Sequence, residues 1–185
     1  MPPPSRESDS QPTGAQISSS VPYKHNEAPP VVAISATFTA EALEPTLAFW
    51  LRELHLDLQI RFAPYNQVFQ QLLDPASLFA GNRNGLNVVL VRFEDWARFR
   101  DAPKIEELDE EVRHLASAVR TAASRAGSPM LVCLCPASPE FLSDAARAAF
   151  AARSEEALRS ALRDLSTVHF DHRRDPAALP GRDLL

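Results

Sequence analysis

The chain has 185 residues and a formal net charge of −5. This length predicts a single domain, and the acidic balance argues against a nucleic-acid partner, because such surfaces are basic. No apolar run reaches the roughly 20 residues that a membrane-spanning helix needs, so we expect no membrane partner. The only cysteines, Cys133 and Cys135, lie two apart on a predicted strand and cannot easily pair with each other, which fits a reducing, cytoplasmic location.

Residues 1–30 differ in composition from the rest of the chain. They contain seven of the sixteen prolines and six serines, with only scattered apolar residues. Such a segment cannot bury enough apolar surface to offset the entropy lost on ordering. We therefore expect 1–30 to be a disordered leader or interdomain linker and 31–170 to form the folded domain.

The first half of the folded region alternates between strand and helix signals. Residues 31–36 are apolar and β-branched, which predicts a strand covered on both faces. A helix should follow, since Pro45 suits a first helical turn and Leu47, Trp50, Leu51 and Leu54 recur at helical spacing. The alternation over 58–62 predicts an edge or half-exposed strand. Two short helices are expected afterwards, over 66–73 and 76–81.

The second half repeats this alternation. Residues 86–91 give the strongest strand signal, and 104–125 carry an apolar stripe that predicts a long helix ending at Gly127. A strand over 130–135, helix in one or two pieces over 139–165 and a short strand over 167–170 should follow. Val89 and Leu131 are then in central strands, where truncation to alanine would cost about 2–4 kcal/mol.

Strands that alternate with helices predict an α/β three-layer sandwich with a mostly parallel five-stranded sheet. The flavodoxin-like strand order 2-1-3-4-5 is the commonest for such a sheet. Residues 171–185 show no convincing helix where a doubly wound sheet normally has one. We therefore expect an irregular tail, or a domain truncated at its C-terminus.

Ligands of open α/β sheets bind beyond the carboxyl ends of the strands. The loops expected there after the first two strands are rich in neutral hydrogen-bonding groups, which favours binding over proton transfer. The predicted binding residues are Thr37, Thr39, Tyr65, Asn66, Gln67, Asn87 and Arg92. Asn87 belongs to an Asn82, Asn84 and Asn87 group that could donate amides to an oxyanion, although Asn84-Gly85 is also a typical turn sequence.

A hydrolytic site is the alternative at the same edge. Ser35 or Thr37 could act as nucleophile with Asp171 and His172 after the last strand. The simpler interpretation is that these hydroxyls cap a turn or helix and that His172 is a surface residue. Similarly, Arg92, Glu94 and Asp95 could form a site, but a helix N-cap with a surface ion pair explains them more simply.

Several motifs that would bring a cofactor are missing from the sequence. It has no G-x-G-x-x-G or G-x-x-x-x-G-K-[ST] phosphate loop and no G-x-S-x-G nucleophile elbow. The Cys133-Leu134-Cys135 segment has no second paired cluster and is a weak zinc signal. We therefore expect no metal and no cofactor bound by this chain alone, and two half-buried structural cysteines.

Four segments together resemble a known family. They are AISATFTAE (33–41), APYNQVFQQLLDP (63–75), NVVLVRFEDW (87–96) and LVCLCPASP (131–139). The pattern is similar to the N-terminal, SGNH-hydrolase-like domain of FkbH-type proteins, as found in nonribosomal peptide and polyketide synthetases. The resemblance covers about residues 31–170 and implies an SGNH-hydrolase-like α/β fold.

The resemblance also implies a setting in secondary-metabolite biosynthesis. In full FkbH-type proteins this domain precedes a HAD-superfamily domain that loads a glyceryl unit onto a carrier protein's phosphopantetheine thiol. Its Asp-x-Asp signature is absent here, and Ser35-Ala36-Thr37 stands where the SGNH family has Gly-Asp-Ser. Asp171-His172 also departs from the family's Asp-x-x-His, so neither activity carries over directly.

These observations predict an accessory domain of a natural-product assembly line. Its expected partners are a carrier protein, adjacent synthetase modules or an acyl–pantetheine group, with contact to the carrier's phosphopantetheine. Two alternatives stay open: a divergent SGNH-type esterase or thioesterase that acts on carrier-bound acyl groups, and a degenerate structural fragment.

Overall fold

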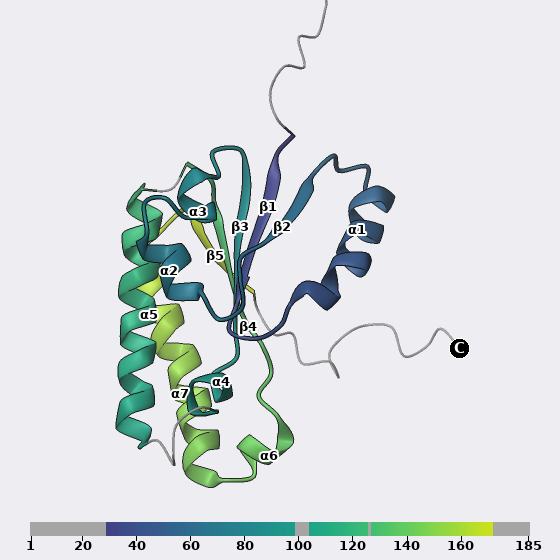
Figure 1. The fold of residues 1–185 in the computed structure, drawn as a ribbon. Coiled ribbons are helices and arrows are strands. Elements are labelled where there is room, and N and C mark those ends of the chain that lie inside the picture. Colours follow the sequence, from purple (N-terminus) through teal and green to yellow (C-terminus); the bar gives the residue numbers. More distant parts are fainter. Residues whose placement is uncertain (1–28, 99–103, 126, 172–185) are drawn as a thin grey trace, which may run out of the picture.

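The computed structural model describes residues 29–98, 104–125 and 127–171. Its strands alternate with helices along the chain (Figure 1). The strands are β1 (Val31–Ala36), β2 (Gln59–Phe62), β3 (Gly85–Val91), β4 (Met130–Leu134) and β5 (Val168–Phe170). The helices are the 3₁₀ turn η1 (Glu41–Leu43), α1 (Glu44–Glu53), α2 (Val68–Leu73), α3 (Leu78–Gly81), α4 (Glu94–Ala97), α5 (Ile105–Arg125), α6 (Pro139–Leu142) and α7 (Ala145–Leu162).

All five strands are parallel and lie in the order β2-β1-β3-β4-β5. The predicted α/β class, five-stranded sheet and 2-1-3-4-5 order are confirmed. In the β1–β3 register, Val31 lies opposite Gly85 and Ala36 opposite Leu90. Registered neighbours in a parallel sheet point to the same face, so this pairing sorts the side chains of both strands between the two outer layers.

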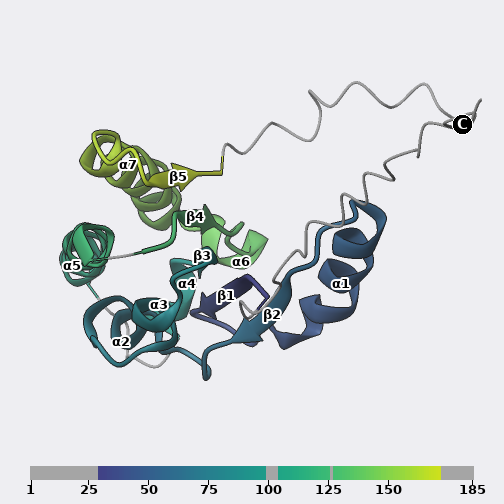
Figure 2. The ribbon, with the colours of Figure 1, turned by 90° about the horizontal axis from the view of Figure 1, so that it is seen from above.

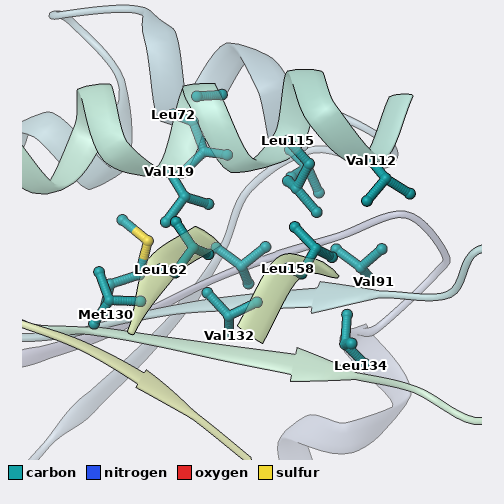
Figure 3. Packing of buried hydrophobic residues seen from close by; sticks show 14 of the residues in the cluster. Leu72, Val91, Val112, Leu115, Val119, Met130, Val132, Leu134, Leu158 and Leu162 are labelled. Carbon is teal, nitrogen blue, oxygen red and sulfur yellow. The ribbon is translucent and has the colours of Figure 1, made fainter. Parts of the chain in front are cut away.

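The main core lies on the face covered by α2, α3, α5 and α7 (Figure 2). Figure 3 shows Leu115 and Val119 of α5 above Val132 of β4, with Leu158 of α7 beside them. These four side chains are fully buried. The long helix owes its place to the apolar stripe read in the sequence, since its buried positions recur every three or four residues.

The opposite face carries α1, which stands apart from the other helices (Figure 2). The sequence placed Leu47, Trp50, Leu51 and Leu54 on one apolar face. In the structure Leu47 and Leu51 are half-buried, whereas Trp50 is 55% and Leu54 61% exposed. None of the ten residues of α1 is buried. This layer is therefore much thinner than the core layer, and α1 keeps an apolar surface exposed.

Several boundaries differ from the sequence-based expectation. The helical region expected over 139–165, in one or two pieces, ends earlier, at Leu162. It forms two helices, α6 and α7, because the Asp144 side chain accepts a hydrogen bond from Arg147 N and starts a new helix. The short helix α4 was not predicted. Residues 1–28 of the expected leader, and the tail beyond Asp171, lie outside the described residues. Among the helices that the structure describes, none combines the length and apolarity needed to cross a membrane.

Val89 and Leu131 were expected to lose similar stability on truncation, but the structure places them in different surroundings. Val89 is 0% exposed and faces the main core, whereas Leu131 is half-buried on the opposite face. We expect Val89→Ala to lower the free energy of unfolding by about 2–3 kcal/mol and Leu131→Ala by about 1 kcal/mol. Urea denaturation of both variants measures this difference. An equal or larger loss for Leu131→Ala would contradict this assignment of the two faces.

Candidate functional site

The loops that follow β1, β3 and β4 are joined at the carboxyl edge of the sheet, at the bottom of Figure 1. Thr37 N donates to Leu90 O at 3.1 Å, and Cys135 N donates to Val91 O at 2.7 Å. On the other side, Ala63 N donates to Ile34 O at 2.7 Å, which continues the ladder toward β2. These bonds extend the sheet by one residue past its strands, so the loops begin side by side.

Thr37 is the central side chain of this edge. It is 1% exposed, and its hydroxyl makes two hydrogen bonds. Oγ1 donates to Asp95 Oδ2 at 2.8 Å and accepts from Arg92 N at 3.0 Å. The hydroxyl therefore links the loop after β1 to the loop after β3, 58 residues further along the chain.

Arg92 holds the other side of the Asp95 carboxylate. Arg92 Nη2 lies 2.7 Å from Asp95 Oδ1, and Nε lies 3.2 Å from each carboxylate oxygen. The hydrogen bond to Asp95 raises the pKa of the Arg92 guanidinium, which also lies 5.2 Å from the centre of the Phe38 ring. The expected surface ion pair is corrected here: Asp95 is only 5% exposed, within α4.

Glu94 extends the arrangement to the loop after β4. Its Oε2 accepts a hydrogen bond from Ser138 N at 2.6 Å, and its Oε1 lies 3.3 Å from Arg92 Nε. We call Thr37, Arg92, Glu94, Asp95 and Ser138 the Asp95 network. Because its members come from three loops, the network fixes the carboxyl edge as one unit.

The residues proposed for a hydrolytic site are not assembled in this part of the chain. Thr37 is fully occupied by the Asp95 network, and Ser35 is 1% exposed with its hydroxyl on the core face and without a hydrogen-bond partner. Asp171 is exposed and follows β5, where its amide donates to Val132 O. His172 lies outside the described residues. The arrangement does not present a poised nucleophile.

Several neutral polar groups lie at the exposed part of this edge, together with the exposed carboxylate of Glu41. Thr39, Tyr65 and Asn66 are exposed and Gln67 is half-buried, which leaves hydroxyl, phenol and amide groups accessible. Asn66 adopts a left-handed conformation with φ of 54°, a region that asparagine tolerates better than most residues. Tyr65 and Phe38 line one shallow depression, so the loops after β1 and β2 border the same surface.

Asn87 lies away from this edge, near the start of β3. It is 0% exposed, with Nδ2 donating to Phe79 O and Oδ1 accepting from Asn82 Nδ2 at 2.9 Å. Its amide secures α3 against the sheet, so the structure does not bring Asn87 together with the other predicted binding residues.

Sequence reasoning also missed the role of Asp95, although its position among Phe93 and Trp96 after an apolar strand was a usable sign of burial.

Both cysteines are half-buried, as expected for structural positions near this edge. Burial raises the pKa of the Cys133 thiol to about 11, with a further contribution from the nearby Asp171 carboxylate. Within the described ranges, no group of three or more histidine, cysteine, aspartate or glutamate side chains could hold a metal ion.

No protein-family model matches the sequence, and no curated protein matches it. Among solved structures, the chain is similar to the N-terminal part of the protein BF1531 from Bacteroides fragilis, which contains a phosphatase domain complexed with Mg. The TM-score is 0.60 at 12% identity, over 77% of this chain and 40% of that chain. The fold is shared. At this identity the likeness extends to the fold alone, and the chain spans less than half the length of the protein it matches.

The Cys133 pKa gives a measurable pH dependence. In a Cys135→Ser variant, Cys133 should react with iodoacetamide at pH 8 about a hundredfold more slowly than an unperturbed thiol, because only the thiolate attacks. The rate should rise as the pH approaches 11. A rate at pH 8 equal to that of the urea-unfolded variant would contradict the burial of this thiol.

Proposed function

We propose that this chain is a binding domain of a natural-product assembly line, which contacts a carrier protein or an adjacent synthetase module at the carboxyl edge of the sheet. In this proposal Thr39, Tyr65, Asn66 and Gln67 take the amides of the carrier's phosphopantetheine arm. Each such hydrogen bond contributes about 0.5–1.5 kcal/mol, so several must act together.

The Thr37 hydroxyl is the observation that carries a binding role over a catalytic one. A nucleophile needs a hydroxyl exposed to substrate and a base that takes its proton. Thr37 is instead only 1% exposed, and its hydroxyl donates a hydrogen bond to Asp95, a carboxylate already held by Arg92. The side chains accessible beside it include the neutral hydrogen-bonding groups of Thr39, Tyr65 and Asn66, which suit the recognition of amides.

The exposed surface of α1 and its flanks supports a protein partner. Phe49, Trp50 and Leu54 are 45%, 55% and 61% exposed, and the first two rings meet edge to face at 5.4 Å. Leu43 and Leu56 extend this surface at either end of the helix. Several large exposed apolar side chains gathered on one helix and its flanks are typical of interaction sites. We call these five residues the α1 patch.

The biosynthetic setting rests on the resemblance to FkbH-type proteins. The similar fold of the BF1531 N-terminal part, in a structure that also contains a phosphatase domain, gives that relation loose support. FkbH-type proteins likewise place this domain before a domain of a phosphatase-containing superfamily. The carrier protein and the phosphopantetheine contact remain parts of the proposal.

The binding proposal is tested by titrating the full chain with a phosphopantetheinylated carrier protein and following backbone amide shifts. We expect saturable shifts over 37–39 and 65–67 and in α1. Trp50→Ala and Tyr65→Ala should each weaken binding at least about fivefold, as central interface aromatics do. Leu73→Ala, an exposed residue of α2, is the matched control and should leave the affinity unchanged.

Two results would contradict the proposal: no saturable binding, or saturable binding that shifts only α5. Hydrolysis is measured in parallel with a p-nitrophenyl ester and an acyl–pantetheine substrate. The proposal expects no turnover. Turnover abolished by Thr37→Ala or Ser35→Ala would instead establish the esterase alternative.

A further inference from the structure

An open cavity of about 670 Å³ lies at the amino end of the sheet, opposite the carboxyl edge. Its size falls within the range of small-molecule sites. Among the described residues, its wall combines apolar groups with two arginines and two asparagines and includes no acidic residue. The lining residues are Pro29, Val31, Arg61, Leu78, Gly81, Asn82, Arg83 and Asn84.

The loop that carries Arg83 and Asn84 is held rigidly. Asn82 is buried, its carbonyl accepts from Ser128 Oγ at 3.0 Å, and its side-chain amide lies 3.1 Å from Val31 O. Val31 N in turn donates to Asn84 O at 2.9 Å. These bonds therefore fix the backbone of the loop from which the Arg83 and Asn84 side chains extend.

Gly85 explains how the loop approaches β1 so closely. Its φ is +141°, and a Cβ atom there would lie 2.1 Å from Val31 O. Only glycine accommodates both the conformation and the contact. The chain bends at Asn84 and Gly85 already begins β3, so the expected turn is not formed there. The bend brings the Arg83 backbone to the rim of the cavity.

Arg61 reaches the same cavity from a different strand. It lies opposite Ala33 in the β1–β2 register, so its side chain is on the face that carries α3. In the part of the chain that the structure describes, neither Arg61 nor Arg83 forms an ion pair, whereas Arg92, Arg120 and Arg153 pair with carboxylates. Two arginines with no ion pair among the described residues therefore line one cavity in a protein of net charge −5.

We propose that this cavity binds the phosphate group of a small phosphorylated ligand between Arg61 and Arg83. Guanidinium groups match phosphate oxygens with paired hydrogen bonds. A phosphate dianion satisfies both cations at once, and the Asn84 amide supplies a further donor. Val31 and Leu78 offer an apolar wall for the rest of the ligand. This site is separate from the carboxyl edge and does not depend on the function proposed for it.

The test is calorimetric titration of the full chain with inorganic pyrophosphate at low ionic strength, with citrate as a carboxylate probe. We expect saturable pyrophosphate binding that weakens at least fivefold in Arg61→Gln and in Arg83→Gln. The matched control is Arg52→Gln, an exposed arginine of α1 on the other face of the sheet, which should bind as the parent does. Circular dichroism confirms that each variant is folded.

Absence of saturable binding would overturn the proposal. So would pyrophosphate binding that Arg61→Gln and Arg83→Gln leave unchanged, because the two arginines would then not form the site. Citrate binding as tight as pyrophosphate binding would overturn the assignment to phosphate.

Discussion

The carboxyl edge of this sheet depends on one buried carboxylate. Asp95 is 5% exposed and accepts hydrogen bonds from Thr37 Oγ1 at 2.8 Å and from Arg92 Nη2 at 2.7 Å. A buried charge is costly unless it is paired and hydrogen-bonded. Satisfying Asp95 therefore requires the loops after β1 and β3 to keep one relative position, and Glu94 extends that requirement to the loop after β4.

The two ends of the sheet consequently offer different chemistry. At the carboxyl edge, Arg92, Glu94 and Asp95 bind one another and their loop partners in the Asp95 network. Exposed neutral polar groups lie at the same edge, and the α1 patch is exposed on the adjoining helix. At the amino end, Arg61 and Arg83 line a cavity, and neither forms an ion pair with a described residue. The first surface suits the amides and apolar groups of a protein partner, and the second suits a phosphate.

The strands followed from the sequence because continuous β-branched runs such as 86–91 mark strands covered on both faces. Their order did not follow from these residues and was expected only as the commonest order for such a sheet. The long helix α5 was equally clear from its apolar stripe. The candidate edge loops were also found, since their place follows from strand ends alone. These features depend on local pattern and on a general rule of parallel sheets, which a single sequence displays.

The burial of Asp95 depends instead on contacts between residues far apart in the chain, and local sequence does not encode them. Arg92, Glu94 and Asp95 read as a surface cluster because their partners Thr37 and Ser138 lie 58 and 44 residues away. Trp50 and Leu54 were misleading in the opposite sense, because an apolar helical stripe indicates a contact face without saying whether this chain supplies the other side. Asn87 was predicted to bind a ligand for the same reason, because its hydrogen bonds to Phe79 and Asn82 inside the protein are not visible in the sequence pattern.

The central claim is that Thr37 and Asp95 act as one structural unit, and a double-mutant cycle measures it directly. The free energy of unfolding is determined by urea denaturation for the parent chain, Thr37→Val, Asp95→Asn and the double variant. The account predicts a coupling energy of about 1–3 kcal/mol between the two positions. Losses that add within about 0.3 kcal/mol would show that the two side chains are independent and would contradict the account.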